Sequence, residues 1–482
     1  LNPENSSFNM AAAVRLKGDL NTDAFIKTLQ AIVDRHEVFR TTFVEDNDGN
    51  VWQHIKTGLA INLKIEDLTE NPIKDIETKE LKVAQDEYDY SFDFEGENLF
   101  RFRLLQSADD RYLFTITIHH IISDGWSVAV FLKELVALYE GYSSNENGVD
   151  VEGLLPRLDV QYADYAYWQN KYLNGEILDS QVDYWRENLK GVPELLRLPT
   201  DRPRPKVQTY NGALSRFTIP ADIKDKIDSF AKERQVTPFM VLLSAYQLLL
   251  SKYSNQSDVC VGIPVAGRNH KEIENLIGFF INALVIRANL EGNNNVEQLL
   301  ADTKEATLGA FANQDIPAET LLDALKIKRN LGYSPLAQVG FALQNIAFDE
   351  GTEETGYKLK GLEIEQLEAE HITAKYDLTL ILSERRLSEK VLSEGQQNES
   401  SSKELLGVAE YNTDLFDEST IENMMAHYVR LLEQMIAEPE LGIDKLSLLT
   451  EDELYKELNI EKDQYEKVLP LTAMQRDLYL AT

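Results

Sequence analysis

The stretch that decides the fold is Thr115–Ser127, TITIHHIISDGWS, where two adjacent histidines follow a strand-like run and precede an Asp–Gly pair. Threonine and apolar residues alternate before the histidines, which predicts a strand. If that strand runs through His120, its side chain shares the apolar face and His119 lies on the other. Glycine tolerates positive φ, so Asp124–Gly125 predicts a turn, and the apolar run after it predicts a helix over 127–142.

The histidine pair is compatible with several chemistries. A metal site would need further ligands, and no nearby Cys or Glu-x-x-His supplies them. A Ser–His–Asp hydrolase would need a nucleophile elbow, and no G-x-S-x-G occurs in the sequence. Acyl transfer without a covalent intermediate needs only a positioned base or hydrogen-bonding group and two substrates held together. The residues alone favour catalysis and a structural histidine pair equally.

Helix and strand patterns alternate in both halves of the 482-residue chain, which predicts two α/β lobes rather than one core. Thr22 is expected to cap a helix in the first half. Four prolines within Pro193–Pro205 predict an extended connector between the lobes. In the second half, Thr237 and Pro238 predict a helix start. Strands are expected at 258–267 and 282–290, a mobile loop over Ser388–Leu405 and a closing amphipathic helix at 419–438.

The composition excludes several classes of protein. A formal net charge of -33 argues against nucleic acid as a partner, because phosphate binding needs Lys and Arg. The single cysteine, Cys260, cannot form an intrachain disulfide, which fits a reducing, cytoplasmic setting, and we expect it to be buried in a strand. The longest apolar run, Phe239–Leu250, is shorter than the ~20 residues that span a bilayer, so no membrane segment is expected.

The sequence HHIISDG at 119–125 resembles the HHxxxDG motif of the condensation domains of nonribosomal peptide synthetases. Seven further segments resemble motifs of that family in the family's order. They are RHEVFRTTF (35–43), YADYAYWQ (162–169), LPTDRPRP (198–205), IGFFINALVIR (277–287), NQDIPAETLL (313–322), YSPLAQVGFALQN (333–345) and AEYNTDLFD (409–417). The chain departs from these motifs at Ala283, Asn313, Ala318 and Ala337, where the family usually has Thr, His, Phe and Phe.

The resemblance implies an α/β fold of two chloramphenicol-acetyltransferase-like lobes arranged in a V, with the active-site tunnel between them. It places the first lobe over 1–175, an interlobe connector over 176–205, the second lobe over 206–455, and a linker with a family motif over 456–482. The implied reaction is amide bond formation, in which the amine of an acceptor aminoacyl thioester attacks a donor acyl or peptidyl thioester.

The implied partners are a donor and an acceptor peptidyl carrier protein, each bearing its substrate on a phosphopantetheine arm, and a neighbouring adenylation domain. The chain itself is then expected to bind no cofactor and no metal, and to be monomeric as an excised domain. Carrier proteins are acidic like this chain, so docking would need local basic segments. LRLPTDRPRPK (196–206) and GRNHK (267–271) are candidates, although each is also typical of a solvated loop.

The resemblance also assigns the site residues. His120 is implied as the catalytic imidazole, acting as a base or as a group that positions the amine, with His119 in support. Asp124 is implied to pair with Arg40 and hold the corner in shape, while Gly125 leaves room for a thioester arm. Trp126 and Asn282 are possible contacts of the substrate arms.

Two questions stay open from the sequence. VLPLTAMQRDLYLAT at 468–482 resembles the motif that opens a condensation domain, and it joins Leu1 with the family's spacing. Either residues 463–482 complete the first lobe, as in a circular permutation, which the clean join favours, or they begin another such domain.

The alternative functions are an epimerisation domain, which also carries the histidine pair, and a non-catalytic recruitment domain, which loses the second histidine or the glycine.

Overall fold

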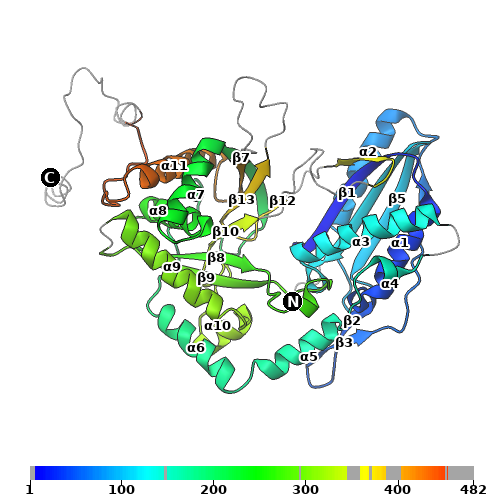
Figure 1. Ribbon diagram of the computed structural model, residues 1–482, viewed down its shortest axis with the longest axis horizontal. Coiled ribbons are helices and arrows are strands. Elements are labelled where there is room, and N and C mark those ends of the chain that lie inside the picture. Colours follow the sequence, from blue (N-terminus) through cyan, green and yellow to red (C-terminus); the bar gives the residue numbers. More distant parts are fainter. Residues whose placement is uncertain are drawn as a thin grey trace.

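The computed structural model describes residues 6–145, 149–292, 295–344, 359–367, 372–386, 403–450 and 453. They form two α/β lobes side by side, each built on its own mixed sheet (Figure 1). This confirms the fold class expected from the alternating helix and strand patterns. The motif at 468–482, on which the permutation hypothesis depends, lies outside the described residues, as does most of the loop expected at Ser388–Leu405.

The first sheet has five strands in the order β11-β1-β6-β5-β4. Their bounds are β1 (Asn9–Gly18), β4 (Ile65–Asp67), β5 (Phe100–Ala108), β6 (Arg111–His119) and β11 (Leu362–Gln366), and a separate hairpin joins β2 (Thr41–Glu45) to β3 (Val51–Ile55). The central strand, β6, pairs antiparallel with both β1 and β5. The histidine corner therefore lies at the end of the central strand, which is hydrogen-bonded to a neighbour on each side.

Helices cover both faces of the first sheet. On one face, α1 (Thr22–Arg35) and α3 (Gly125–Ser144) contribute Phe25 and Phe131 to a core that includes Phe114 of β6. On the other face, Ala84 of α2 (Ile73–Tyr88) packs against strand residues of β1, β5 and β6. The first helix begins as predicted except that Asn21, not Thr22, caps it by accepting a hydrogen bond from the Ala24 amide at 3.0 Å.

The second sheet has seven strands in the order β12-β7-β14-β13-β10-β8-β9. Their bounds are β7 (Asn211–Ile219), β8 (Asp258–Val265), β9 (Asn282–Asn289), β10 (Val339–Gln344), β12 (Ile372–Thr373), β13 (Leu378–Arg386) and β14 (Lys403–Asn412). The helices of this lobe are α7 (Ala221–Glu233), α8 (Pro238–Ser254), α9 (Val296–Ala312), α10 (Ala318–Leu325) and α11 (Glu418–Ala437). The predicted strands at 258–267 and 282–290 and the predicted closing helix are thus confirmed.

Two local predictions in the second lobe are also confirmed. Thr237 caps α8 by accepting a hydrogen bond from the Met240 amide, and Pro238 is the first helical residue, where its missing amide proton costs nothing. Cys260 is buried in β8, and burial raises the pKa of its thiol to about 12. The thiol is therefore a packing group rather than a nucleophile.

The region between the lobes differs from the expected boundary. Between α4 (Val151–Leu154) and the second sheet lie α5 (Tyr162–Tyr172) and α6 (Glu176–Asn188). Trp185 of α6 is buried in the core of the second lobe, so this helix packs as part of that lobe rather than as a connector. The proline-rich segment after α6 has no helix or strand, as predicted, and Arg204 fixes it to the second lobe through an ion pair with Asp377.

Two segments from the second half of the sequence complete the first lobe. Strand β11 pairs antiparallel with β1, and Leu359 beside it is buried in the first core. The segment 266–281, which joins β8 to β9, reaches the first lobe and buries Ile277 in the same core. The expected boundary of 206–455 for the second lobe missed both, because edge pairing and interlobe packing leave no local signal in the sequence.

Candidate active site

The histidine corner is a change of direction at the end of β6. The strand ends at His119, and a 3-10 turn, His120–Ile122, follows before Asp124 caps α3. The expectation that the strand runs through His120 is therefore wrong, and strand alternation does not decide where its side chain points. The turn instead presents the His120 ring to Phe279 of the segment 266–281, with 5.2 Å between ring centroids.

His119 is enclosed by aromatic rings. It packs edge-on against Phe94, with 4.8 Å between centroids, and lies near Phe8 and Phe92. Its Nδ1 accepts a hydrogen bond from the Ile121 amide at 3.2 Å, which leaves the proton of the neutral ring on Nε2. Burial, then the neighbouring His120 and Lys375, lower the pKa of His119 to about 4. The ring is therefore neutral at physiological pH and supports the corner by packing.

His120 has different surroundings. Burial first, and then the cation of Lys375, lower the pKa of its imidazole below the ordinary value. Its buried Nδ1 makes no hydrogen bond of normal geometry to a described residue, but the backbones of His120 itself and of Ser123 interact with the ring and raise its pKa against these two effects. A neutral imidazole has one nitrogen that donates and one that accepts, so its Nε2 can still form a hydrogen bond with a bound molecule.

Lys375 is a site residue that the sequence analysis missed. It reaches solvent but is largely surrounded by protein, and this burial lowers the pKa of its ammonium group. The ammonium lies 5.3 Å from the centre of the Phe8 ring, and the Phe8 carbonyl accepts the His120 amide proton at 2.9 Å. The only signal in the sequence is a lone lysine before the apolar strand β13, which by itself is typical of a strand end.

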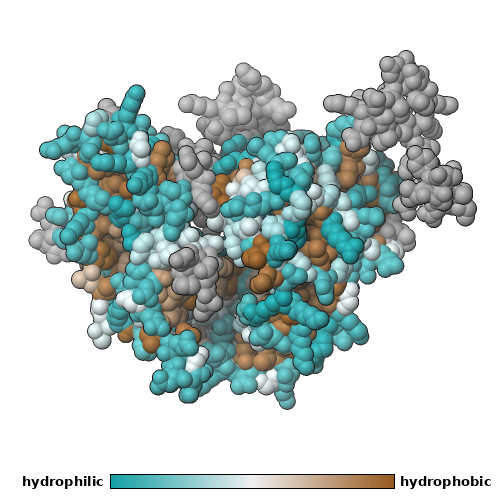
Figure 2. Space-filling view, turned by 180° about the vertical axis from the view of Figure 1, so that it is seen from behind, coloured by the Kyte–Doolittle hydropathy of each residue, from teal (hydrophilic) through white to brown (hydrophobic). Residues whose placement is uncertain are grey.

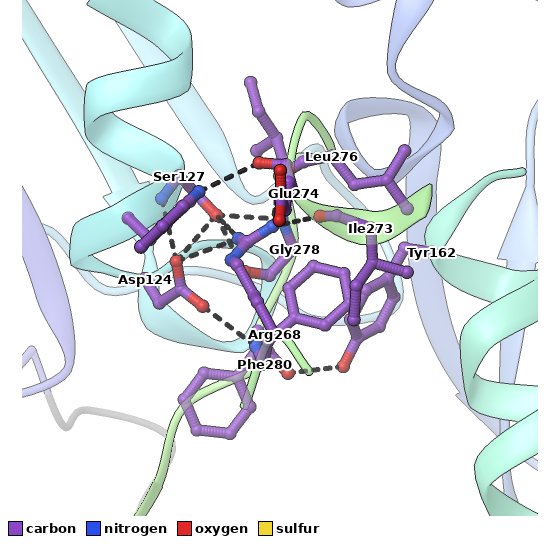
Figure 3. A network of polar contacts seen from close by, with 12 residues as sticks. Asp124, Ser127, Tyr162, Arg268, Ile273, Glu274, Leu276, Gly278 and Phe280 are labelled. Carbon is purple, nitrogen blue, oxygen red and sulfur yellow. Dashed lines mark hydrogen bonds and ion pairs between the residues drawn. The ribbon is translucent and has the colours of Figure 1, made fainter. Parts of the chain in front are cut away.

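Asp124 is held by a dense network (Figure 3). One carboxylate oxygen accepts from the Ser127 amide at 2.8 Å and from Arg268 at 3.2 Å, and the other accepts from the Phe280 amide at 2.9 Å. Asp124 and Arg268 are both almost fully buried. The aspartate thus caps α3 and binds the second lobe's segment 266–281 at once.

The expected pairing of Asp124 with Arg40 is wrong. Arg40 ends a 3-10 turn before β2 and donates to the carbonyls of Lys56, at 2.6 Å, and Asp34, at 3.3 Å. It ties the end of α1 to the β2–β3 hairpin instead. Arg268, from the GRNHK segment proposed as a basic docking spot, is the partner, because a buried carboxylate needs a buried cation and the segment 266–281 brings one.

Arg268 also fixes the segment on which it lies. Its guanidinium donates to the carbonyls of Ile273, at 2.6 Å, and Leu276, at 2.8 Å, and to the Ser127 hydroxyl at 2.8 Å. Ser127 in turn accepts from the Gly278 amide at 3.0 Å. A separate contact lies nearby, where buried His36 accepts from the Ile277 amide and pairs with Glu134 at 2.9 Å. Polar and apolar contacts therefore attach the segment to the first lobe along most of its length.

The other predicted site residues lie around this junction. A β-carbon added at Gly125 would meet no atom within 4 Å, so there is open space at this position of the corner. Trp126 is 42% exposed, and its indole donates to the Glu274 carbonyl at 2.8 Å. Asn282 donates to the carbonyls of Gln314 and Ile316 and accepts from the amide of Ala283, so both ends of its side-chain amide are in use. Contacts of Trp126 and Asn282 with a substrate stay predictions.

The surface is hollowed between the two lobes when the molecule is seen from behind (Figure 2). Large aromatic side chains near His120 remain exposed, including Phe8 at 44% and Phe279 at 39%. Exposed aromatic surface beside a polar functional group is typical of a binding site.

Within the described residues, no three His, Cys, Asp or Glu side chains are grouped so that they could hold a metal ion. No helix in the same part of the chain is both long and apolar enough to cross a membrane.

Comparison with known proteins agrees with the motifs. The sequence matches the condensation-domain family over residues 1–458. It is 41% identical over 453 residues to one of the linear gramicidin synthase proteins of Brevibacillus parabrevis, covering 94% of this chain but only 8% of that protein. It is 35% identical to phosphinothricin tripeptide synthetase PhsC of Streptomyces viridochromogenes, covering 95% of this chain and 40% of that protein.

Solved structures show the same fold. The X-domain from teicoplanin biosynthesis superposes with a TM-score of 0.79 at 24% identity, covering 93% of this chain and 94% of that one. The four-domain nonribosomal peptide synthetase AB3403 superposes with a TM-score of 0.76 at 23% identity, covering 94% of this chain and 33% of that one. With its histidine corner, its two-lobe fold and its match over nearly the whole length, the chain belongs to the condensation-domain family of nonribosomal peptide synthetases.

Proposed function

We propose that this chain forms an amide bond between two substrates held as thioesters on the phosphopantetheine arms of a donor and an acceptor carrier protein. The observation that supports this most is the state of His120, whose pKa is lowered so that its ring is neutral, in a corner where a β-carbon added at Gly125 would meet no atom. In the reaction the acceptor nitrogen forms a bond to the donor carbonyl carbon, the carbon–sulfur bond breaks, and the amine proton leaves with the thiol.

The electrostatics favour one role for His120. An α-amino group has a pKa of about 8, so a large share is protonated at neutral pH and must lose its proton before attack. The cation of Lys375 and the burial of the corner both disfavour an imidazolium ring. We therefore propose that His120 accepts a hydrogen bond from the amine and orients it, and that the proton passes on without resting on the ring. Holding both thioesters together supplies the proximity part of the rate enhancement.

The partners follow from this reaction. Donor and acceptor carrier proteins would each bring one loaded arm, and an adenylation domain would be a neighbour, because the similar curated proteins are much longer synthetases. The arms are substrates here, so the chain would need no cofactor of its own. We propose a cytoplasmic location, since the one cysteine is buried and unpaired.

One assay separates this function from its alternatives. The chain is incubated with two separately loaded carrier proteins, and the thioester-bound products are analysed by mass spectrometry and chiral chromatography. A new amide on the acceptor carrier supports condensation. Inversion of an aminoacyl group without a new amide would show an epimerisation domain instead, and the absence of both would overturn catalysis.

A recruitment domain is the second candidate, because the fold resembles that of an X-domain solved in complex with a protein named OxyB. The likeness is at 24% identity and concerns the fold alone. His120 and Gly125, which recruitment domains lose by the resemblance described above, are both present. Tight binding of a third protein together with no amide product would favour this candidate.

A further inference from the structure

A second hollow lies in the second lobe, away from the histidine corner. It is a cavity of about 160 Å³ between β8, β9, α10 and the turn 334–337. Its walls are mostly apolar and include Trp185, Leu284, Ile316 and Leu322. An engineered apolar cavity of about 150 Å³ holds a benzene molecule, so this one has room for a single aromatic ring or branched aliphatic group.

Small side chains create this space. Ala283 of β9, Ala318 at the first turn of α10 and Ala337 of the turn all line the cavity. These are three of the positions at which the chain departs from the larger residues of the family motifs quoted above. Three alanines from three different elements therefore open one common cavity, and a larger residue at any of them would occupy part of it.

Tyr376 contributes a phenol ring to the cavity wall, in which Ser334 and Glu319 are the other polar residues. A side chain added at Gly262 would come within 3.0 Å of the Tyr376 hydroxyl, and one added at Gly340 within 3.2 Å of its ring. These two glycines pair across β8 and β10, so the ring lies over a strip of sheet without side chains. The hydroxyl has no hydrogen-bond partner among the described residues, and burial raises its pKa, which keeps it a neutral donor.

The backbone at the cavity wall is also unusual. Leu336 has a φ of 67°, in the left-handed region that a branched side chain rarely adopts. Such a conformation costs stability and persists only where the surrounding structure enforces it, most often at functional sites. Its side chain is part of the cavity wall.

Short stretches of chain connect the wall of the cavity to residues that face His120. Ala283 follows Phe279 by four residues, which can span at most about 14 Å of extended chain. The Phe279 ring is the one that faces His120 at 5.2 Å. On the other side, Tyr376 follows Lys375 directly, and the charge of Lys375 acts on His120. A thioester positioned at His120 could therefore place its apolar group in this cavity.

We propose that this cavity is a specificity pocket that takes one compact apolar group, an aromatic ring or a branched aliphatic side chain, from one of the two thioester substrates. The proposal rests on the amide-forming function proposed above. The apolar walls supply the affinity, because burying such a group removes its surface from water. The Tyr376 hydroxyl is available to a polar atom next to that group.

The first test compares substrates of different size. Leucyl, phenylalanyl and glycyl thioesters are varied on the donor carrier with a glycyl acceptor, and then on the acceptor carrier with a glycyl donor. Ala318→Phe fills the cavity, and Ala312→Phe, at an exposed position at the end of α9, is the matched control.

We expect Ala318→Phe to lower the ratio of kcat/KM for leucyl or phenylalanyl to that for glycyl by at least about tenfold in one arm, with the ratio unchanged in Ala312→Phe. The arm that responds identifies the carrier whose substrate enters. An unchanged ratio in both arms overturns the proposal. Ala283→Leu, at an exposed strand position, is a second filling variant should Ala318→Phe not fold.

A binding experiment separates failure of the pocket from failure of the catalytic function. Toluene is titrated into the full chain and followed by ligand-observed NMR. Binding by the wild type and by Ala312→Phe, lost in Ala318→Phe, supports the pocket even if no substrate pair gives an amide. No binding of toluene by the wild type overturns it, whatever the assay of amide formation shows.

Discussion

His120 and Asp124 are four residues apart, yet their surroundings are opposite. The Nδ1 of His120 forms no hydrogen bond of normal geometry with a described residue, and burial and the cation of Lys375 disfavour a charge on the ring. The carboxylate of Asp124 is almost fully buried and accepts hydrogen bonds on both oxygens from four donors, all of which lie in its own helix or in the segment 266–281. His120 is therefore available to a bound molecule, whereas the hydrogen-bonding capacity of Asp124 is satisfied by contacts that hold the lobes together.

The difference shows how a short motif can contain two kinds of residue. A group that must interact with a substrate cannot have its hydrogen-bonding capacity satisfied by the protein, whereas a buried charge is stable only when its capacity is satisfied. Variants at the two positions should therefore fail in different ways, one in activity and the other in folding.

The largest effect is expected for His120→Ala. The rate of amide formation should fall by about 10²-fold or more, the loss expected when a reacting group is no longer held in position. Because the ring has no polar partner to lose, the thermal midpoint should change little. Product analysis with two loaded carriers and a thermal melt check both parts. Product formed at the wild-type rate would contradict the assignment of His120.

Asp124→Ala should act on stability instead. It leaves the guanidinium of Arg268 buried without its partner, which costs about 3–5 kcal/mol in the free energy of unfolding. Denaturant unfolding measures this directly, provided that soluble protein is obtained. A stable but inactive Asp124→Ala protein would show that the carboxylate takes part in the reaction.

A double-mutant cycle sharpens this result. Asp124 and Arg268 variants combined should be far from additive, because the two side chains are in contact. Asp124 combined with Arg40→Ala serves as the matched control and should be additive, since Arg40 bonds to other groups. Coupling of Asp124 to Arg40 would restore the pairing that the family resemblance implied.

Because His119 is buried as a neutral ring, we expect the free energy of unfolding to depend on pH. Its pKa is about 4 when folded and 6.5 when exposed, so the unfolded chain binds the proton more readily as the pH falls. The full contribution of the neutral ring to stability is present above pH 6.5 and is lost as the pH falls through 4, a difference of about 3 kcal/mol. Urea unfolding from pH 7 to pH 4 should show this slope in the wild type and a smaller slope in His119→Phe. Equal slopes in both proteins would mean that His119 is not the titrating group.

The smallest effect is expected for Gly125→Leu. A β-carbon at this position meets no atom within 4 Å, so the thermal midpoint should stay within about 2 °C of the wild type. The same side chain would occupy space proposed for a thioester arm, and kcat/KM should fall by about tenfold. Wild-type kcat/KM in this variant would place the arm elsewhere.

The sequence predicted what depends on local pattern and failed where distant segments meet. The strand before His119, the helix after Asp124 and the cap at Thr237 were all found, because alternation and capping act within a few residues. Arg268, the partner of Asp124, was missed because the sequence around a lone arginine in a loop does not indicate which carboxylate it contacts. Lys375 was missed for the same reason, because only the packing of the two lobes brings it to the histidines.

The paths of β11 and of the segment 266–281 have a consequence for exchanging parts between family members. A chimaera joined at Gly175 would combine the first lobe of one protein with a β1 neighbour and an Asp124 partner inherited from another. Both replaced contacts are specific, one through strand register and one through a buried charge. A chimaera that keeps both contacts must therefore take these two distant segments from the same protein as the first lobe. Because the two segments lie within the second half of the sequence, the whole domain is the smallest part that can be exchanged without breaking these contacts.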